Sequence, residues 1–399
     1  MAVYPVKWFH SSMQGAPSLG DTTEGALTAL IKAVLVTGFG QLQATSITFD
    51  PATGWAKANF QSGHKYQQDS VIHVEGVTPV AYNGEHRVMQ VDSNNVWFEI
   101  DGGNPGSPGT GTMMVKVAPL GWTITHESPD GKIFIVRPTD VSASGNISLR
   151  IDNSAYTGWA ANNQWLAKVA MVEDVIDINT FTTAFAWAWP CTGRFGDKRW
   201  DLVGDSQMFY FIPAYGATGG RSLLYFGYIK TVRPGDRYHA ALAFYPENGT
   251  GNTSRQWQDG WNMSMYYNIL PVNGNNGYKQ LARPYHQMFG SIAFQTLGIF
   301  SVWGSGLPFP NPADNAFYVS ADPLLVMEAA GSVLRGSMPG IVMPFTTQAS
   351  LINRNYRNLP AIPGKIVRFL DATRSESLVG TFGGQPLAMF GFDLTGPWR

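Results

Sequence analysis

Residues 63–92, GHKYQQDSVIHVEGVTPVAYNGEHRVMQVD, decide the fold class of this 399-residue chain. Apolar and polar residues alternate along positions 70–77 and 86–91, which is the period-two pattern of half-buried β-strands. Asn83-Gly84 lies between the two runs and predicts a tight hairpin turn with positive φ angles, with Tyr82 lying over the edge of the module. We therefore expect antiparallel β-structure here.

The same pattern continues on both sides of this stretch. From Ile47 to Val117, short runs of β-branched and aromatic residues alternate with turn sequences such as DGGNPGSPGTGT (residues 101–112). Their spacing predicts a small β-barrel or sandwich module over residues 46–118. Residues 119–399 carry short strands and many turns without a long amphipathic helix, and this predicts a large antiparallel β-sandwich-like domain that is open to subdivision.

Residues 1–45 are predicted to form an N-terminal arm and one amphipathic helix. Asp21 and Glu24 have the spacing of a capping box, and Gly38 supplies the stop. The apolar positions fall on a single face: Leu27, Leu30, Ile31, Val34 and Leu35. Two interpretations stay open, because this stripe either packs on its own domain or forms an interface with another subunit.

The composition indicates a turn-rich β-protein with little surface charge. The chain has 44 glycines, 25 prolines and 13% aromatic residues, but only 14% charged residues and a net charge of -1. Such a balance offers no field for nucleic-acid backbones, so we expect no nucleic-acid partner. It suits surfaces that are uncharged or covered by partners.

Targeting and cofactor signals are also lacking. The start has no signal-peptide pattern, and the most apolar stretch, residues 26–40, is too short to span a membrane and is interrupted by Lys32. We expect synthesis in a cytosol and no membrane insertion. Cys191 is the only cysteine, so it cannot form an internal disulfide, and no Cys/His spacing resembles a zinc site. No metal and no cofactor are predicted.

The usual enzyme motifs are absent, and we predict no catalytic residues. A nucleophile elbow, a phosphate-binding loop and a dinucleotide glycine pattern are all missing. Asp201, Asp205 and Asp236 could supply the carboxylate pair of a glycoside hydrolase. However, Asp205 and Asp236 follow glycine in VGDS and PGDR, where an aspartate most simply bonds the backbone of a turn. For His73 and His86, satisfied polar positions on an exposed sheet face are favoured over a shared site.

The tryptophans raise a second possibility, glycan binding. Trp187 and Trp189 are two residues apart in a strand, so we expect them to stack together into a sheet-sheet core. Trp257, Trp261 and Trp303 could be platforms for sugar rings, and the Asn/Gly-rich context of Trp257 and Trp261 makes these two the candidate ligand-binding residues. A subunit interface explains exposed tryptophans equally well and is favoured, because interface cores are enriched in them.

Several motifs together resemble a known class of proteins. The 63–88 segment, with its YNG turn and the following PGSPGTGT loop, resembles a small β-module of tailed-bacteriophage virion proteins, similar to the half-domain fold of ubiquitin-activating enzymes. RWDLVGDSQMFYFIPAY (199–215), LLYFGYIKTVRPGDRYHAAL (223–242), RGSMPGIVMP (335–344) and LAMFGFDLTGPWR (387–399) resemble the large domain of siphophage tail- or baseplate-associated virion proteins.

The resemblance implies a structural protein of the tail tip, baseplate or fibre-attachment region. It implies other tail proteins as partners, a homo-oligomer with threefold or sixfold symmetry, and a place in the virion after synthesis in the host cytoplasm. In this interpretation the arm and helix, with the small module at Ile47 to Val117, supply contacts to neighbouring subunits. Two alternatives remain: a receptor-binding protein that recognises a bacterial surface glycan through aromatic loops, and a tail-associated wall hydrolase.

Overall fold

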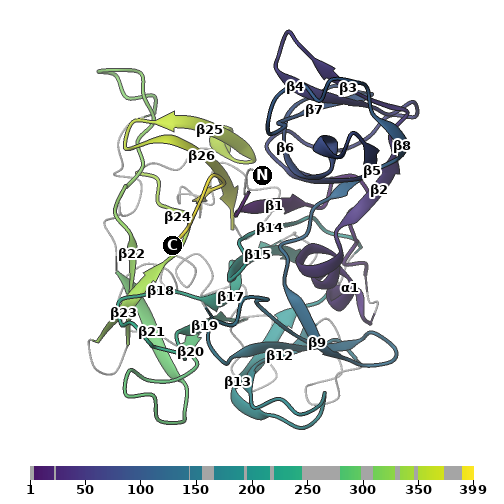
Figure 1. The fold of residues 1–399 in the computed structure, drawn as a ribbon. Coiled ribbons are helices and arrows are strands. Elements are labelled where there is room, and N and C mark those ends of the chain that lie inside the picture. The colour runs from purple at the N-terminus through teal and green to yellow at the C-terminus, as the bar shows by residue number, and fades with distance from the viewer. Residues whose placement is uncertain are drawn as a thin grey trace.

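The computed structural model describes residues 4–21, 24–142, 144–154, 166–192, 196–215, 220–244, 279–297, 309–328, 333–345, 349–372 and 389–399. Over these residues the protein is mainly β, with four sheets and one short α-helix near the N-terminus, so the predicted fold class is confirmed. Figure 1 shows a barrel-like module at the upper right and a larger body of sheets below it and to its left.

The small module is a curled sheet with the strand order β2-β8-β5-β6-β7-β4-β3. Its strands are β2 (Phe39–Gln43), β3 (Ser46–Asp50), β4 (Trp55–Asn59), β5 (Val71–Thr78), β6 (Gly84–Val91), β7 (Asn95–Phe98) and β8 (Thr110–Val117). The sheet curls back on itself, because the Gly109 N–H donates to the Ile47 carbonyl at 2.7 Å. The sheet includes β2, so the module begins before residue 46, where the sequence placed its boundary.

The largest sheet runs through the centre of the molecule in the order β1-β14-β15-β17-β19-β20-β21-β22-β23-β18, with β16 paired to β15. Its strands are β1 (Lys7–His10), β14 (Trp200–Gly204), β15 (Met208–Tyr215), β16 (Gly220–Arg221), β17 (Leu224–Tyr228), β18 (Lys230–Thr231), β19 (Ala240–Ala243), β20 (Lys279–Leu281), β21 (Ile292–Leu297), β22 (Leu324–Glu328) and β23 (Leu334–Met338). Because β1 pairs with β14, the N-terminal segment is part of this body.

Two smaller sheets complete the body. One is a meander of β9 (Thr123–Glu127), β10 (Ile133–Arg137), β11 (Ser148–Asp152), β12 (Leu166–Glu173) and β13 (Thr182–Pro190). The other, in the order β24-β27-β26-β25, consists of β24 (Ile341–Val342), β25 (Arg354–Leu359), β26 (Ile362–Asp371) and β27 (Met389–Asp393), with a 3₁₀ turn at Ala349–Leu351. This C-terminal sheet lies beside the small module at the top of Figure 1.

The helix is shorter than predicted and lies inside the molecule. It comprises α1 (Ala26–Lys32) and a π-helical turn (Ala33–Thr37). The five residues of the apolar stripe each expose 0% of their surface: Leu27, Leu30, Ile31, Val34 and Leu35. The stripe therefore packs on the core of its own chain, and its assignment as a subunit interface is corrected. Burial of a continuous apolar stripe is what holds so short a helix in place.

The predicted capping box is wrong, whereas the predicted stop is present. Gly25 occupies the N-cap position with φ 80°, and no side chain at that position caps the helix. A distant residue supplies the acceptor, because the Leu27 N–H donates to Asn153 Oδ1 at 2.9 Å. Gly38 ends the helix with φ 71°, and a Cβ there would lie 2.5 Å from the Val117 carbonyl oxygen.

The tight hairpin turn predicted at Asn83-Gly84 is wrong as well. A 3₁₀ turn (Val80–Tyr82) joins β5 to β6, and Asn83 is extended, with φ -83° and ψ 153°. The Asn83 side chain bonds the backbone instead: its Oδ1 accepts from the Val77 N–H at 3.0 Å and its Nδ2 donates to the Val77 carbonyl at 2.7 Å. Tyr82 is fully buried, not lying over the edge, and its hydroxyl donates to the Ser107 carbonyl at 3.0 Å.

One continuous hydrophobic cluster connects the module, the helix and the large body. It contains Val74 of the barrel, Leu30 of α1, Phe209 of the central sheet and Trp398 near the C-terminus. A variant that lacks residues 1–45 would lose β1, α1 and β2 from this core. Such a variant would report on folding of the chain before it reported on contacts of the arm and helix with neighbouring subunits. No helix in the described part of the chain is long and apolar enough to cross a membrane.

Candidate functional site

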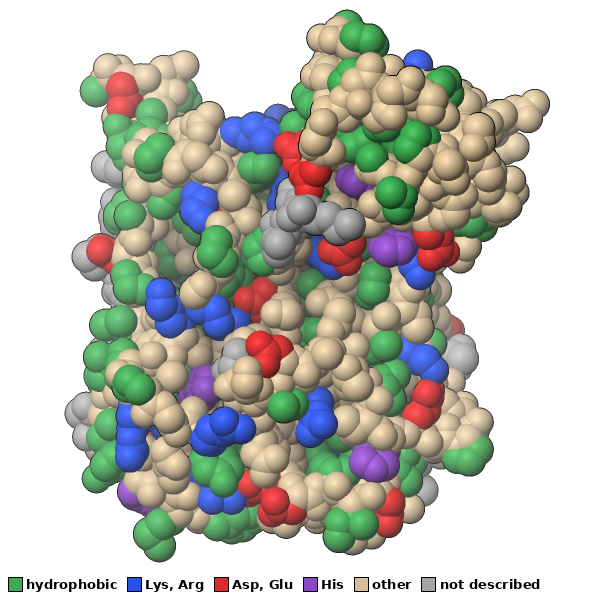
Figure 2. All heavy atoms as spheres, viewed as in Figure 1, with side chains coloured by type: hydrophobic (Ala, Val, Ile, Leu, Met, Phe, Trp, Pro, Cys, Tyr) green, Lys and Arg blue, Asp and Glu red, His purple; other side chains and the backbone are tan. Residues whose placement is uncertain are grey.

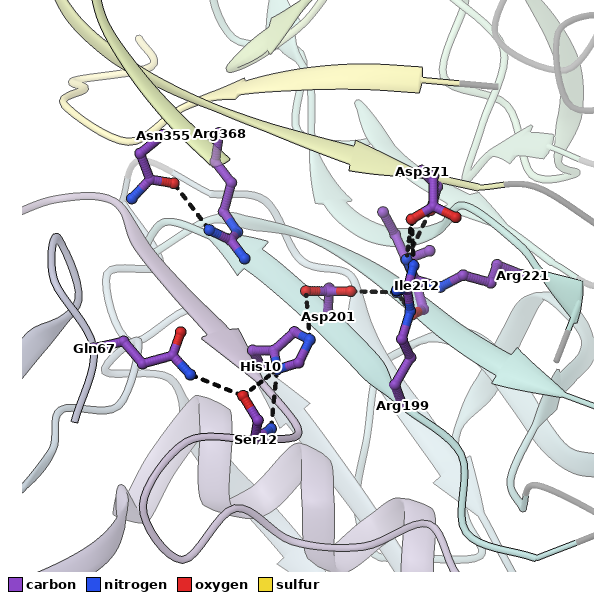
Figure 3. A network of polar contacts seen from close by, with 10 residues as sticks. All are labelled: His10, Ser12, Gln67, Arg199, Asp201, Ile212, Arg221, Asn355, Arg368 and Asp371. Carbon is purple, nitrogen blue, oxygen red and sulfur yellow. Dashed lines mark hydrogen bonds and ion pairs between the residues drawn. The ribbon is translucent and has the colours of Figure 1, made fainter. Parts of the chain in front are cut away.

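A network of buried charges lies where the central sheet meets the C-terminal sheet (Figure 3). Arg221 is its hub: Nη1 donates to Oδ1 and to the carbonyl of Asp371, both at 2.9 Å. Nη2 donates to the carboxylate of Asp201 and, at 2.9 Å, to the Ile212 carbonyl. Arg199 also bonds the Asp371 carboxylate. These contacts join β14, β15 and β16 to the end of β26.

The network is charged and fully enclosed. The side chains of Arg221, Asp201 and Asp371 are at most 1% exposed. Burial is the largest influence and by itself raises the pKa of Asp201, but the charges of Arg221, His10, Arg368 and Arg199 together outweigh it and leave that pKa below its usual value. Burial likewise lowers the pKa of Arg221, and Asp201 and Asp371 outweigh that effect and raise it. The groups stay ionised because each compensates the others.

Arg368 extends the network from β26 onto the face of β1. Its guanidinium lies 3.9 Å from the centre of the Trp8 ring, and Nη1 donates to Asn355 Oδ1 at 2.9 Å. Burial lowers the pKa of Arg368 to about 10, although Asp201 opposes this effect. The stack on Trp8 and the amide of Asn355 stabilise a cation that makes no ion pair among the residues described.

At the rim of the network, three residues have the composition of a catalytic triad. His10 Nδ1 lies 2.8 Å from Ser12 Oγ, and His10 Nε2 lies 3.8 Å from Asp201 Oδ1. Gln67 Nε2 donates to Ser12 Oγ at 2.8 Å. A hydroxyl, an imidazole and a carboxylate in this order are the groups that activate a serine nucleophile.

Electrostatics and local geometry argue against that chemistry. Burial lowers the pKa of His10, and the charges of Arg368, Arg221 and Arg199 lower it further, whereas Asp201 opposes the shift. A general base must take up a proton and become an imidazolium, and this low pKa disfavours that form. The Ser12 N–H also donates to His10 Nδ1, at 2.9 Å. The same histidine turn recurs between Tyr66 and His64 (3.1 Å) and between Met288 and His286 (3.2 Å). The contact between His10 and Ser12 is therefore part of a turn.

The other two candidate acids bind turn backbone, as predicted, and each also binds an arginine. Asp205 Oδ1 accepts the N–H groups of Gln207 and Met208 at 2.8 and 2.7 Å, and Oδ2 accepts from Arg399 at 2.7 Å. Burial raises the pKa of Asp205, an effect that Arg399 opposes.

Asp236 likewise accepts from a backbone N–H of its turn and from an arginine. Its Oδ1 accepts the Tyr238 N–H at 3.0 Å, and its Oδ2 accepts from Arg335 at 2.6 Å. Arg335 also bonds Glu328 at 2.6 Å. Each candidate carboxylate is thus held by an arginine.

His73 and His86 of the small module lie on opposite faces of the sheet. Ile72 pairs with His86 and His73 pairs with Glu85, so His73 and His86 point in opposite directions. His86 is buried, not exposed as expected, and its Nε2 lies 2.9 Å from the Tyr82 carbonyl. Within the described ranges no group of three or more His, Cys, Asp or Glu residues is placed to hold a metal.

The strand tryptophans face the core, but each packs on phenylalanine. Trp189 is fully buried, its Nε1 donates to the Ala243 carbonyl at 2.7 Å, and its ring lies 6.1 Å from that of Phe211. Trp187 is half-buried and lies 5.8 Å from the ring of Phe244. The candidate ligand residues Trp257 and Trp261, together with Trp303, lie outside the described residues.

Comparison with known proteins leaves the chain without an assigned family. No protein-family model matches it, and no curated protein is significantly similar to it in sequence.

Sequence reasoning missed the arginines of the network, although a signal for them exists. In KIVRFLDA (residues 365–372), Arg368 and Asp371 interrupt an apolar run that forms a buried strand. A charged residue inside such a run requires a buried partner, because an uncompensated charge in the core is costly. The pattern marks a charge pair but does not identify the partner.

Proposed function

We propose that this chain is a structural component of a phage tail tip or baseplate. It would assemble with other tail proteins, and carry fibres or receptor-binding proteins, through rigid docking without catalysis. It would occupy the virion after synthesis in the host cytoplasm, as a homo-oligomer with threefold or sixfold symmetry.

The observation that carries the proposal is how the resembling motifs pair. Asp205 of VGD bonds Arg399 of TGPWR across 194 positions, and Asp236 of PGD bonds Arg335 of RGSMPG across 99 positions. Motifs that are individually weak thus form two specific ion pairs in the folded chain. This supports treating them as parts of a single signature, which is the signature of the virion family that the sequence resembles.

The charge network supports a mechanical role over the hydrolase alternative. A glycoside hydrolase needs two carboxyl groups that face a shared substrate space. Asp201, Asp205 and Asp236 are each bound by an arginine instead. Such pairs fit a body whose sheets keep one arrangement, because breaking a buried pair leaves an uncompensated charge and is strongly destabilising.

The test is to count the polypeptide in particles of the phage that encodes it. Gradient-purified particles are digested, and its peptides are quantified by mass spectrometry against those of the major tail protein. We expect a low copy number divisible by three. Absence from the particle would contradict the proposal, and a copy number as high as that of the major tail protein would contradict a position at the tail tip.

A further inference from the structure

One end of the molecule exposes a group of large apolar side chains. The loop between β20 and β21 exposes 48% of Tyr285, 69% of Met288 and 60% of Phe289, and Val232 on the turn after β18 is 56% exposed. This loop lies at the lower left of Figure 1. Exposed apolar groups gathered in one place mark interaction sites.

The loop is held in one conformation. Arg283 Nη2 lies 2.7 Å from both carboxylate oxygens of Glu173, and Arg283 Nη1 donates to the Gln287 carbonyl at 2.9 Å. Arg335 donates to the Arg283 carbonyl at 2.8 Å, and Arg233 donates to the Tyr285 carbonyl. A loop fixed in this way loses little conformational entropy when a partner binds it.

An acidic turn adjoins this basic and aromatic loop. Glu173, the partner of Arg283, is the last residue of β12, and the turn that follows it exposes 75% of Ile176, together with Asp174 and Asp177. On the loop side, Arg233 and Arg237 are exposed. Figure 2 shows basic, acidic and hydrophobic side chains mixed over the lower end of the molecule.

We propose that this end face, formed by the 283–290 loop, the 230–237 turn and the 174–180 turn, binds a second copy of the chain about a two-fold axis. In a two-fold contact, each surface of one copy meets the complementary surface of the other. A face that carries a basic loop and an acidic turn side by side is therefore self-complementary. The basic, aromatic loop would pack on the acidic turn around Ile176, and the reverse contact would form at the same time. Tyr, Phe, Met and Arg are the residues enriched in interface cores.

Charge favours this occupant over an anionic membrane. The carboxylates of Asp174 and Asp177 flank the exposed Ile176, and they would repel acidic headgroups, whereas they complement the arginines of a second copy. This two-fold contact is separate from the threefold or sixfold axis of the proposed virion oligomer and does not depend on the virion role, so it is tested on the purified protein.

The test is sedimentation equilibrium over a concentration series, with three variants. Phe289→Ser removes the most apolar contact. Arg233→Glu with Arg237→Glu reverses the loop charge. Asp174→Asn and Asp177→Asn with Ile176→Lys make the acidic turn basic, and asparagine tolerates the positive φ of Asp174 (51°). Val80→Ser removes a side chain that is 75% exposed on the small module and is the matched control.

We expect the wild type to reach twice the monomer mass of 43.6 kDa. Phe289→Ser and each charge-reversed variant should raise the dimer dissociation constant by about tenfold or more, and Val80→Ser should leave it unchanged. A mixture of the two reversed variants should form a heterodimer, because both of its contacts then join opposite charges. Circular dichroism and thermal unfolding identify any variant that fails to fold.

Three results would overturn the inference. They are a wild type that stays monomeric at every concentration, a dimer that persists in Phe289→Ser and in the folded loop variant, and the absence of a heterodimer in the mixture. Binding of the wild type to phosphatidylglycerol vesicles without self-association would assign the loop to a membrane instead.

Discussion

At the residue scale, a buried lysine is poorly compensated. Lys279 lies in β20, is 1% exposed, and its Nζ has no hydrogen-bond partner among the residues that the structure describes. The ring of Phe294 lies 5.5 Å from it in a cation–π contact. Burial lowers the pKa of Lys279 to about 7. The side chain is therefore partly neutral at physiological pH, and its burial costs stability there.

This group gives the fold a pH dependence. The pKa of lysine in an unfolded chain is about 10.4, so between about pH 7 and pH 10 the unfolded state binds more protons than the folded state. Stability should then rise with pH across that window. Lys279→Met should remove this slope and raise the free energy of unfolding at pH 7 by about 1–3 kcal/mol.

Urea unfolding at pH 7 and pH 9.5 measures both effects. Lys65→Met, at an exposed lysine, is the control and should keep the slope. A Lys279→Met protein with the stability and slope of the wild type would show that the amine is solvated in the folded chain.

At the element scale, the N-terminal helix depends on residues from elsewhere in the chain. It has only 7 α-helical residues, too few to be stable alone in water. Its first turn is closed by Asn153, which follows β11, and its π-helical end is bound by Trp122, whose N–H donates to the Leu35 carbonyl at 2.9 Å. The helix is thus a product of its contacts with the meander.

Replacing the distant cap tests this dependence. Asn153→Ala leaves the buried Leu27 N–H without its acceptor and should lower the free energy of unfolding by about 1 kcal/mol. Asn104→Ala removes an exposed amide whose oxygen accepts from the N–H of Gly106, and it should change stability by less than about 0.5 kcal/mol. Equal effects of the two substitutions in urea titrations would rule out a capping role for Asn153.

At the scale of the whole molecule, buried charges join sheets that a hydrophobic core alone would leave free to shift. Arg221 connects the central sheet to the C-terminal sheet through Asp371. Asp69 of the small module bonds Asn355 of the C-terminal sheet at 2.9 Å, and Arg87 Nη2 donates to the Leu394 carbonyl at 3.0 Å. These directional bonds fix how the sheets lie relative to one another.

Arg221→Met should show how much this network contributes to the free energy of unfolding. The substitution leaves Asp201 and Asp371 without their shared cation and should cost about 3–5 kcal/mol, the usual effect of breaking a buried pair. Arg137→Met, at an exposed strand end, is the matched control and should lie within about 0.5 kcal/mol of the wild type. Both are measured by urea unfolding at pH 7; a cost below about 1 kcal/mol for Arg221→Met would mean that the carboxylates find other partners.

Features that depend on neighbours along the chain were readable from the sequence. The period-two alternation determined the β class, because the face that a strand residue occupies follows from its position in the strand. The stop at Gly38 and the turns capped by Asp205 and Asp236 were predictable for the same reason, since each contact is within five positions. The hairpin at Asn83 failed because its side chain bonds the backbone of Val77, six positions back.

Only the tertiary structure decided the features whose partners are distant. The pairing of β1 with β14, the cap of α1 by a residue 126 positions away, and the partners of Arg221 at 20 and 150 positions follow from the packing of sheets. A sequence shows that a charge in an apolar run needs a counter-charge, but many carboxylates qualify. The packed fold selects one of them, because burial makes the interaction strong only at short distance and in the right geometry.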